Sequence, residues 1–553
     1  MSINDNTLNK AQTQKRILIA TAISFAFFIA YDFLYLQPKQ AAVNAANAQN
    51  TKVVEQKTTA TQNSAPQASQ KTAPTNTASP TQAPTTNSTS STGVASIIET
   101  KHNKFEIDNL GRISQVTLKD VQYVDEDGKH IELFATNQLR PLEVRFTNPK
   151  LNNEAFKTNV IASSTNVDAT KSIQKLTLTQ KLSGTTLTKT LTFYPDGHYD
   201  IEASSTNKEN FFITPGFRPN VIADMYTDHG ALMSLNDGTL NIIEDEDMDK
   251  NVELIGVNVA SAFDRYYATV FYNYKTSMAV SVMKDVNDSP NMFIHAKDNI
   301  KLHGYIGPKE YNTLAALNPK LVDVIEYGWF TFIAKPMFSM LQYIYNYVGN
   351  WGWTIVIVTI LIKLLLFPLS HKGMVSMNRL KDLAPKVKQI QEKYKDDKQK
   401  ASMHMMELYK KEGANPMGGC LPMILQIPVF FAIYRVLLNA IELKGAEWML
   451  WITDLAEMDP YFVLPILMGA TMWFQQKITP NTMQDEMQKK MFQLLPIIFT
   501  FFFLWFPAGL TLYWFINNLF TIGQQYYVNK IFETAKEQRH EKHLEQKSAK
   551  KKK

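Results

Sequence analysis

Residues 351–371 read WGWTIVIVTILIKLLLFPLSH, and this stretch decides the fold that the sequence predicts. From Trp353 to Leu369 it is almost wholly apolar, and a helix of that length crosses most of a hydrocarbon core. Lys363 interrupts the run near its middle, where a cation normally faces protein or water rather than lipid. We therefore expect Lys363 to face a polar cavity inside the bilayer. The alternative is that the long side chain of Lys363 extends along the helix and places its ammonium at the nearer membrane surface.

The composition divides the chain into a polar amino-terminal part and an apolar carboxy-terminal part. Hydrophobic residues make 45% of the 553 residues, but they are concentrated in the last two-fifths of the chain. The net charge of +6 is modest for this length and does not indicate a nucleic-acid binder over the whole chain. Cys420 is the only cysteine, which excludes an intramolecular disulfide and a cysteine-based metal site.

The amino-terminal residues predict a membrane anchor followed by a tether. Residues 1–16 are polar and end in two cations, which predicts a cytoplasmic amino terminus, and residues 17–36 are mostly apolar, which predicts a first span. A cleaved signal peptide is the alternative, because Ala-rich sequence follows. Residues 41–95 contain almost no large apolar side chain, so we expect a disordered tether outside the cytoplasm.

Residues 96–320 predict a large antiparallel β-sandwich. Short runs alternate apolar and polar residues, and turn signals such as Asp127-Gly128 separate them. No metal-ligand spacing, nucleophile motif or phosphate loop stands out, so we expect no enzyme activity, no cofactor and no nucleotide. The acidic run 244–249, EDEDMD, is expected to be a solvated loop rather than a calcium site. A sugar-binding role is the alternative for this domain.

Charged and amphipathic segments flank the 353–371 span. The aromatic-rich stretch 327–348 predicts an amphipathic helix in the outer membrane interface, with packing against the β-domain as the alternative. Residues 372–417 carry eleven Lys and Arg against six Asp and Glu, which predicts a cytoplasmic helical hairpin. The hairpin also carries Met403, Met405 and Met406. Methionines suit adaptable apolar surfaces, so we expect these three to help recruit substrates, although core packing is the commoner use of methionine.

The remaining chain predicts four more spans and a basic cytoplasmic tail. The spans are 421–438, 461–476, 491–506 and 508–528, and the tail is 529–553, with nine basic residues. The expected fold is therefore an α-helical polytopic membrane protein with six spans and a large outer β-sandwich. Arg435, near the outer end of the third span, is expected to extend toward the membrane surface.

Several polar residues in these spans could share a cavity with the lysine. They are Thr359, Gln426, Thr511, Tyr513, Asn517 and Asn518. Three motifs in the same region resemble the YidC family of membrane-protein insertases. They are 415–422 (NPMGGCLP), 426–428 (QIP) and 502–513 (FFLWFPAGLTLY). The order of anchor, tether, outer β-domain and five further spans is similar to the Gram-negative bacterial form from end to end.

The resemblance implies an inner-membrane protein with its large domain in the periplasm and its carboxy terminus in the cytoplasm. Such a protein inserts nascent membrane proteins and helps to fold them, alone or beside the Sec translocon. Its intramembrane cation, usually arginine, lies in a hydrophilic groove that opens to the cytoplasm and to lipid. Lys363 keeps the positive charge of that arginine but lacks its planar guanidinium, which can form two parallel hydrogen bonds to one carboxylate. A tyrosine pair in relatives corresponds here to Tyr513 and Trp514, so the implied groove also includes Trp514.

The basic tail 529–553 predicts a contact with the ribosome, because its cations can neutralise RNA phosphates; topology signalling or lipid contact alone is the alternative. Membrane lipids are expected as a further partner. A small-solute or ion transporter is the alternative function, because it also uses an intramembrane cation. Transporters usually show repeated halves and paired broken helices, and this sequence shows neither. A membrane-anchored, sugar-active enzyme is the third possibility, but it leaves the membrane motifs unexplained.

Overall fold

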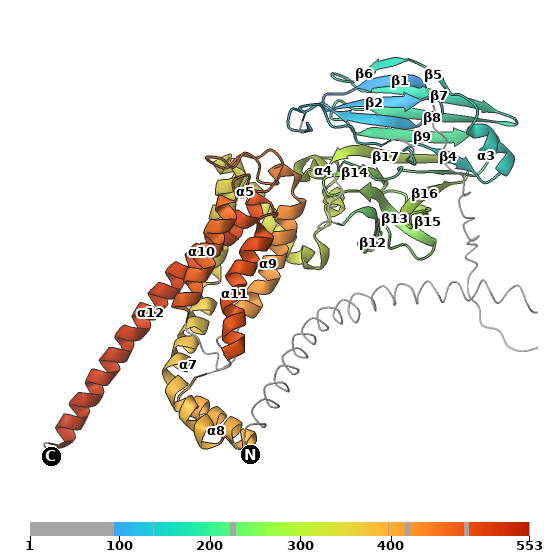
Figure 1. The fold of residues 1–553 in the computed structure, drawn as a ribbon. Helices are drawn as coiled ribbons and strands as arrows, with labels where there is room; N and C mark the ends of the chain where they lie inside the picture. Colours follow the sequence, from blue (N-terminus) through green and yellow to red (C-terminus); the bar gives the residue numbers. More distant parts are fainter. Residues whose placement is uncertain are drawn as a thin grey trace, which may run out of the picture. The chain divides into compact units, whose positions relative to one another are not determined.

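The computed structural model describes residues 93–551, with gaps at 126, 136–137, 222–227, 396, 415–420 and 480–485. The predicted amino terminus 1–16, the anchor 17–36 and most of the tether 41–95 lie outside the described residues, as does most of the 415–422 motif. Strands make up the first part of the described chain and helices the second (Figure 1).

The β-domain, which comprises strands β1 to β17, is a sandwich of two sheets. The smaller sheet has the order β3-β2-β1-β6. Its strands are β1 (Val94–Glu99), β2 (Asn103–Asp108), β3 (Ile113–Leu118) and β6 (Asn166–Asp168). Strands β1 and β6 pair in parallel, so the prediction of a purely antiparallel sandwich is wrong at this pair. The long connection between them allows the crossover that a parallel pair requires.

The larger sheet has thirteen strands, and its main path runs β4-β10-β16-β15-β13-β14-β17-β9-β8-β7-β5. The bounds are β4 (Val144–Phe146), β5 (Ile161–Ala162), β7 (Gln174–Leu182), β8 (Thr185–Phe193), β9 (Tyr199–Ser205), β10 (Phe211–Ile213), β11 (Gly230–Leu235), β12 (Leu240–Glu244), β13 (Val252–Phe263), β14 (Tyr267–Tyr272), β15 (Met278–Lys284), β16 (Pro290–Ala296) and β17 (Asn299–Pro308). A short helix, α3 (Pro149–Ala155), follows β4. Strand β13 pairs with β15 through its first half and with β14 through its second half. Its register shifts at Gly256, whose φ of +83° suits a bulge.

Alternating side chains build the core between the two sheets. Along β8, burial alternates strictly from Thr185 to Phe193, as the sequence pattern predicts. Phe105 of the smaller sheet contacts Phe193 and Tyr199 of the larger sheet, with ring centroids 5.2 and 6.0 Å apart. The hydrophobic effect therefore joins the sheets through residues far apart in the sequence.

The acidic run 244–249 differs from its expected form. The side chain of Asp245 is only 5% exposed and pairs with Arg218, and it lies 3.3 Å from a ring nitrogen of His229. Met248 is also buried. The solvated-loop prediction is wrong for these two residues, because a buried carboxylate needs a charged partner and finds one in Arg218.

The helical region follows the β-domain. Its helices are α4 (Tyr311–Leu317), α5 (Thr331–Val348), α6 (Trp351–Leu365), α7 (Phe367–Lys393), α8 (Lys398–Lys411), α9 (Leu421–Asn439), α10 (Val463–Ile478), α11 (Glu486–Phe503) and α12 (Ala508–Lys551). Helix α12 is continuous, so the helix covers the described part of the basic tail as well as the apolar run 508–528. Lys536 on this extension contacts Asp382 of α7 at 2.8 Å.

The stretch 351–371 is not one straight helix. Helix α6 ends at Leu365, α7 begins at Phe367, and the two are bent by 63°. Pro368 explains the break, because its ring removes a backbone donor and is tolerated only in the first turn of a helix. By length and apolar composition, no single described helix suffices to cross a bilayer, whereas the bent α6–α7 pair passes that test together.

Arg435 of α9, which was expected to extend toward the membrane surface, pairs with a residue of the β-domain. Its guanidinium pairs with Asp228 at 2.9 Å and lies 3.7 Å from a carboxylate oxygen of Glu326. Nearby, the backbone N–H of Tyr311 donates to Glu442 at 2.9 Å. Arginine suits such a site, because its fork can serve two carboxylates at once.

Helix α5 buries one face and exposes aromatic rings on another. The buried residues are Ala334, Met337, Phe338 and Leu341. Phe332, Tyr343 and Tyr347 are exposed. This amphipathic division agrees with the sequence pattern.

Candidate functional site

Lys363 lies near the end of α6 and is only 8% exposed. Its Nζ donates to the hydroxyl of Thr521 on α12 at 3.0 Å. Within the part of the chain that the structure describes, no carboxylate pairs with Lys363. Because an ammonium carries three donors, two remain for another acceptor.

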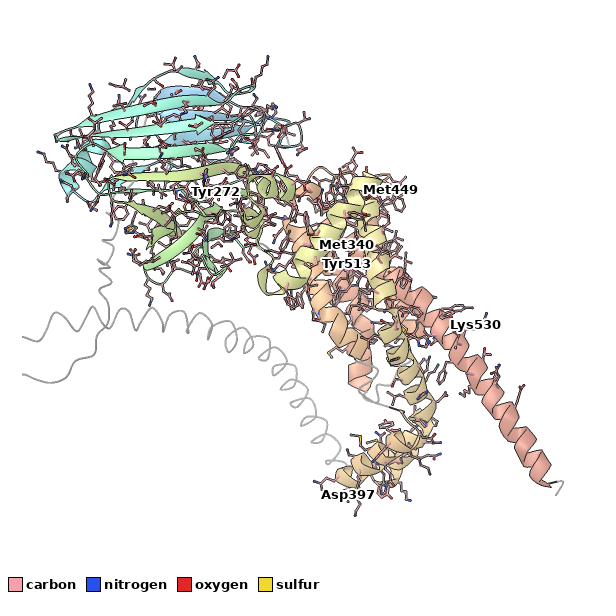
Figure 2. The ribbon with its side chains drawn as sticks, turned by 180° about the vertical axis from the view of Figure 1, so that it is seen from behind. Tyr272, Met340, Asp397, Met449, Tyr513 and Lys530 are labelled. Carbon is pink, nitrogen blue, oxygen red and sulfur yellow. The ribbon has the colours of Figure 1, made fainter. Side chains whose placement is uncertain are left out.

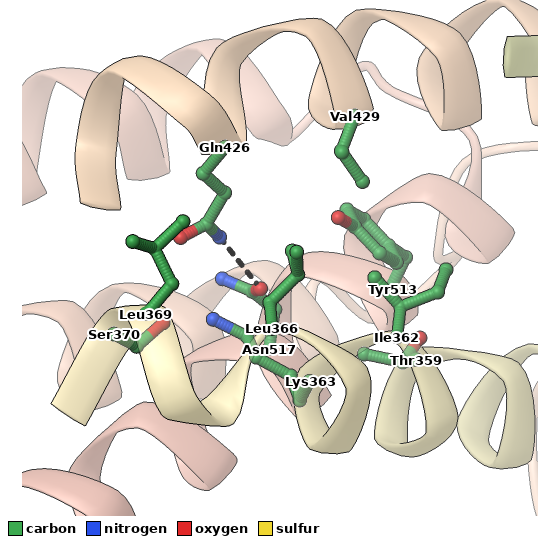
Figure 3. A pocket seen from close by; sticks show the side chains of 10 residues that line it. All are labelled: Thr359, Ile362, Lys363, Leu366, Leu369, Ser370, Gln426, Val429, Tyr513 and Asn517. Atoms are coloured by element: carbon green, nitrogen blue, oxygen red, sulfur yellow. Dashed lines mark hydrogen bonds between the residues drawn. The ribbon is translucent and has the colours of Figure 1, made fainter. Parts of the chain in front are cut away.

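A small cleft, with room for about one water molecule, adjoins the lysine. Figure 3 shows its lining side chains, which come from α6, the start of α7, α9 and α12. They are Thr359, Ile362, Lys363, Leu366, Leu369, Ser370, Gln426, Val429, Tyr513 and Asn517. Gln426 of α9 donates to Asn517 of α12 at 2.9 Å, so an amide bridge joins the two helices beside the cation.

The residues from α12 lie on one helical face. Tyr513, Asn517 and Thr521 follow each other at intervals of four, which places them above one another on a helix. The Thr521 hydroxyl also donates to the backbone carbonyl of Asn517 at 2.7 Å, which orients its oxygen. The structure therefore adds Thr521 and Ser370 to the residues expected from the sequence. For Thr521, the four-residue spacing from Asn517 was the available signal.

The expected residues divide into two groups. Thr359, Gln426, Tyr513 and Asn517 line the cleft beside Lys363. The other three, Thr511, Trp514 and Asn518, are absent from the lining and contact other parts of the chain. Their partners are the carbonyl of Pro507 for Thr511, the rings of Phe430, Phe499 and Phe503 for Trp514, and the hydroxyl of Thr471 for Asn518.

The three methionines lie on α8, which contributes no residue to the cleft lining. Met403 and Met406 are 59% and 63% exposed. The sulfur of Met405 accepts from the side-chain amide of Gln391 at 3.7 Å, so this methionine contributes to the contact between α7 and α8. Two of the three are therefore available as a flexible apolar surface.

The chemistry of the cleft suits the binding of a negative or polar group. It offers an ammonium, two amides and hydroxyls at the edge of an otherwise apolar helical region. Among the described residues, no group of three or more His, Cys, Asp or Glu side chains could hold a metal ion. The arrangement suits recognition by charge and hydrogen bonding.

A β-sandwich joined to a group of apolar helices that encloses a buried cation defines a two-part protein, and the helical part carries the candidate site. The profile described as "60Kd inner membrane protein" matches residues 343–537, and the profile described as "YidC periplasmic domain" matches residues 96–340. The chain belongs to the YidC family of membrane protein insertases.

Three relatives establish this membership, and each is named "Membrane protein insertase YidC". The relative from Campylobacter jejuni is 51% identical over 95% of this chain and 98% of its own length. The relative from Wolinella succinogenes is 47% identical over 96% and 97%. The relative from Helicobacter pylori is 44% identical over 96% and 98%. A solved structure, titled as an active YidC insertase with its first transmembrane domain resolved, covers 79% of this chain and 94% of its own at 18% identity, with a TM-score of 0.34.

Proposed function

We propose that this protein inserts nascent membrane proteins into the inner membrane and helps them to fold. The cleft beside Lys363 is the receiving groove for the polar tail of the substrate. One observation carries the proposal: a buried cation has a single hydroxyl as its hydrogen-bond partner and faces a small cleft lined by polar side chains. The names of the relatives support the same activity.

The proposed mechanism lowers the barrier to moving a polar tail across lipid. In hydrocarbon, the tail would leave its charges and backbone groups without partners. A polar groove that reaches partway through the bilayer shortens the apolar path, and Lys363 attracts acidic residues of the tail. The membrane potential then favours outward movement of a negative tail by about 2.3 kcal/mol per charge per 100 mV.

The apolar part of the substrate leaves sideways in this mechanism. Helices α9 and α11, the proposed third and fifth spans, carry exposed apolar side chains along which a substrate helix can pack. They are Ile427 and Phe431 on α9, and Leu494, Ile497, Phe501 and Phe502 on α11. A departing substrate span would exchange these contacts for lipid, which is equally apolar, so release is not strongly opposed.

The proposal includes a topology and two large partners. We place the β-domain in the periplasm, the α7–α8 hairpin and the end of α12 in the cytoplasm, and the apolar helices across the inner membrane in six spans, counting 17–36. Insertion proceeds alone or beside the Sec translocon. The basic end of α12 contacts ribosomal RNA, because nine cations within residues 529–553 can neutralise phosphates.

The ribosome contact is tested by removing residues 534–553. Co-sedimentation with ribosomes should fall, and the wild-type interaction should weaken steeply with salt, because counterions are released on binding. Co-sedimentation that is unchanged by the truncation would show that these cations serve topology or lipid contact alone.

The groove is tested by replacing Lys363 and measuring insertion of an acidic-tailed and a neutral-tailed substrate into proteoliposomes. Lys363→Arg should retain activity, because charge and reach are kept. Lys363→Ala should impair the acidic-tailed substrate selectively, and Lys363→Glu should be worst, because like charges repel. Lys477→Ala is the matched control, since this lysine sits over the ring of Trp473 on α10 and does not line the cleft.

The outcome distinguishes the receptor role from a role in orienting the helix. A lysine that only orients α6 would make Ala harmless, or equally harmful for both substrates. Equal insertion of both substrates by Lys363→Ala, at normal protein levels, would therefore contradict the proposed groove.

A further inference from the structure

A second cleft, on the β-domain, brings aromatic rings together with two His–Asp pairs. Its volume is about 360 Å³. Its walls are formed by the β8–β9 hairpin, the end of β14, strand β17 and the end of α4. Tyr272, which lines the cleft, is labelled in Figure 2. The lining residues that carry the argument are Tyr194, Asp196, His198, Asp200, Tyr272 and His303. The insertase function uses none of them.

The register of the sheet creates one half of this cluster. Tyr272 of β14 lies opposite His303 of β17, and His303 lies opposite Asp200 of β9. The imidazole Nδ1 of His303 is 2.6 Å from Asp200 Oδ1, and the rings of Tyr272 and His303 stack with centroids 5.1 Å apart. The hydroxyl of Tyr194 donates to the other oxygen of Asp200 at 2.8 Å. Three strands thus hold these side chains in fixed positions.

The β8–β9 hairpin supplies the other half. Its turn requires Gly197, whose φ is +92°, and returns the chain so that His198 stacks on Tyr194, with ring centroids 4.0 Å apart and planes 12° apart. His198 Nδ1 lies 2.5 Å from Asp196 Oδ1. Each carboxylate accepts from the Nδ1 of its histidine, so each ring keeps Nε2 for another partner.

The chemistry of the lining selects the class of ligand. The charged groups are two aspartates and one lysine, Lys275, which disfavours an anion such as a phosphate. Only Ala316 and Leu317 are aliphatic, which disfavours a purely apolar ligand. Tyrosine faces, imidazoles and carboxylates instead suit a ligand with apolar C–H faces and many hydroxyl groups.

The size of the cleft adds a second observation. Its volume of about 360 Å³ lies within the range of small-molecule sites. Tyr274 also lines the cleft, so its ring adds to the aromatic surface beside Tyr272.

We propose that this cleft binds a neutral saccharide. The rings of Tyr194 and Tyr272 support the faces of the sugar, while Asp196, His198 and His303 hydrogen-bond its hydroxyl groups. A free short saccharide and the end of a longer glycan present the same chemistry, so the two sources are separated by experiment. The proposal does not depend on the insertase function.

The test uses the full-length protein in lipid nanodiscs, because maltoside and glucoside detergents themselves carry sugars. Saturation-transfer NMR with maltose, cellobiose and diacetylchitobiose at millimolar concentration should detect binding of at least one sugar. Asp200→Ala and His303→Ala should each weaken that binding by about tenfold or more, because a charge-assisted or oriented hydrogen bond is lost. Asp120→Ala is the matched control, since it removes the carboxylate of another exposed pair, His102–Asp120 at 3.0 Å, outside the cleft.

The possible results decide the proposal in either direction. Disaccharide binding assigns a free short saccharide, and retention on immobilised cellulose or chitin without disaccharide binding assigns a longer glycan. If none of the sugars or polymers binds, or if both Asp200→Ala and His303→Ala bind as tightly as the wild type, the proposal is overturned. His303, whose side chain is 46% exposed, keeps the test valid if Asp200→Ala fails to fold.

Discussion

Lys189, a buried lysine of the β-domain, and Lys363, the buried lysine of the described helices, have opposite surroundings. Lys189 of the β-domain is 2% exposed, and its Nζ donates to the backbone carbonyl of Gly111 and, at 3.0 Å, to that of Leu142. Burial lowers its pKa to about 8. Lys363 of the helical region is similarly buried but has one hydroxyl as its partner and a cleft beside it.

Burial alone therefore does not identify a functional cation. Lys189 lies near a compact ionic network in which Arg112 pairs with Asp108 at 2.8 Å and with Glu143 at 3.0 Å. Its donors are directed at the protein itself. Lys363 has unused donors and faces a cleft lined by polar side chains, and these two features together make it the candidate site.

The largest expected effect comes from Lys363→Met, which keeps the length of the side chain and removes its charge. Insertion of an acidic-tailed substrate should fall by about tenfold or more, since a charge-assisted contact is lost. Unfolding should change little, because an apolar replacement of a buried charge is often neutral. Proteoliposome insertion and thermal unfolding measure the two effects. A large loss of stability with full activity would make Lys363 the structural lysine instead.

Lys189→Met should produce the reverse pattern. Two backbone carbonyls lose their donor, so we expect the free energy of unfolding of the β-domain to fall by about 2 kcal/mol. Hydrogen exchange of the amides in β8 and β9 should become faster, while insertion by the folded protein stays near the wild-type level. Unchanged exchange would mean that water or neighbouring groups replace the ammonium.

A smaller effect concerns pH and the contact between α4 and the segment after α9. Burial raises the pKa of Glu442 to about 7, while its carboxylate accepts from the N–H of Tyr311. Because the folded state holds this proton more tightly than the unfolded state, protonated Glu442 stabilises the fold. This stabilisation is complete below pH 4.5 and is lost as the pH rises through 7. Exchange of the Tyr311 amide, corrected for intrinsic rates, should therefore accelerate over this window. Glu442→Gln keeps the acceptor and should flatten the dependence.

The smallest effect on insertion is expected from deleting residues 100–310 while keeping 327–348. The cleft around Lys363 has no lining residue from the deleted part. Arg435 would lose Asp228 but keep Glu326, so the helical region should retain its arginine–carboxylate contact. Complementation at matched protein levels measures the result. A loss of insertion would assign the β-domain a direct part in the reaction.

Local patterns predicted much of the fold. The alternation along 185–193 indicated a half-buried strand, and Asp127-Gly128 indicated a turn, which Gly128 forms with a φ of +77°. The parallel pairing of β1 with β6 was not predictable, because pairing direction depends on how a long connection returns. Likewise, Pro368 was visible in the sequence, but the 63° bend between α6 and α7 also depends on the packing around them.

The sequence by itself determined the family, the order of the β-domain and the helical region, and the presence of a lone cation within an apolar run. Motif identity and hydrophobic period are local properties, and they survive without knowledge of any contact. The tertiary structure decided which polar residues meet that cation. Thr521 of α12 contacts Lys363 of α6, and Gln426 of α9 contacts Asn517 of α12. Trp514 and Asn518 are adjacent in the sequence to cleft residues, but they contact other parts of the chain. Rotation of each helix about its own axis sets these contacts, and that rotation is fixed by packing between helices.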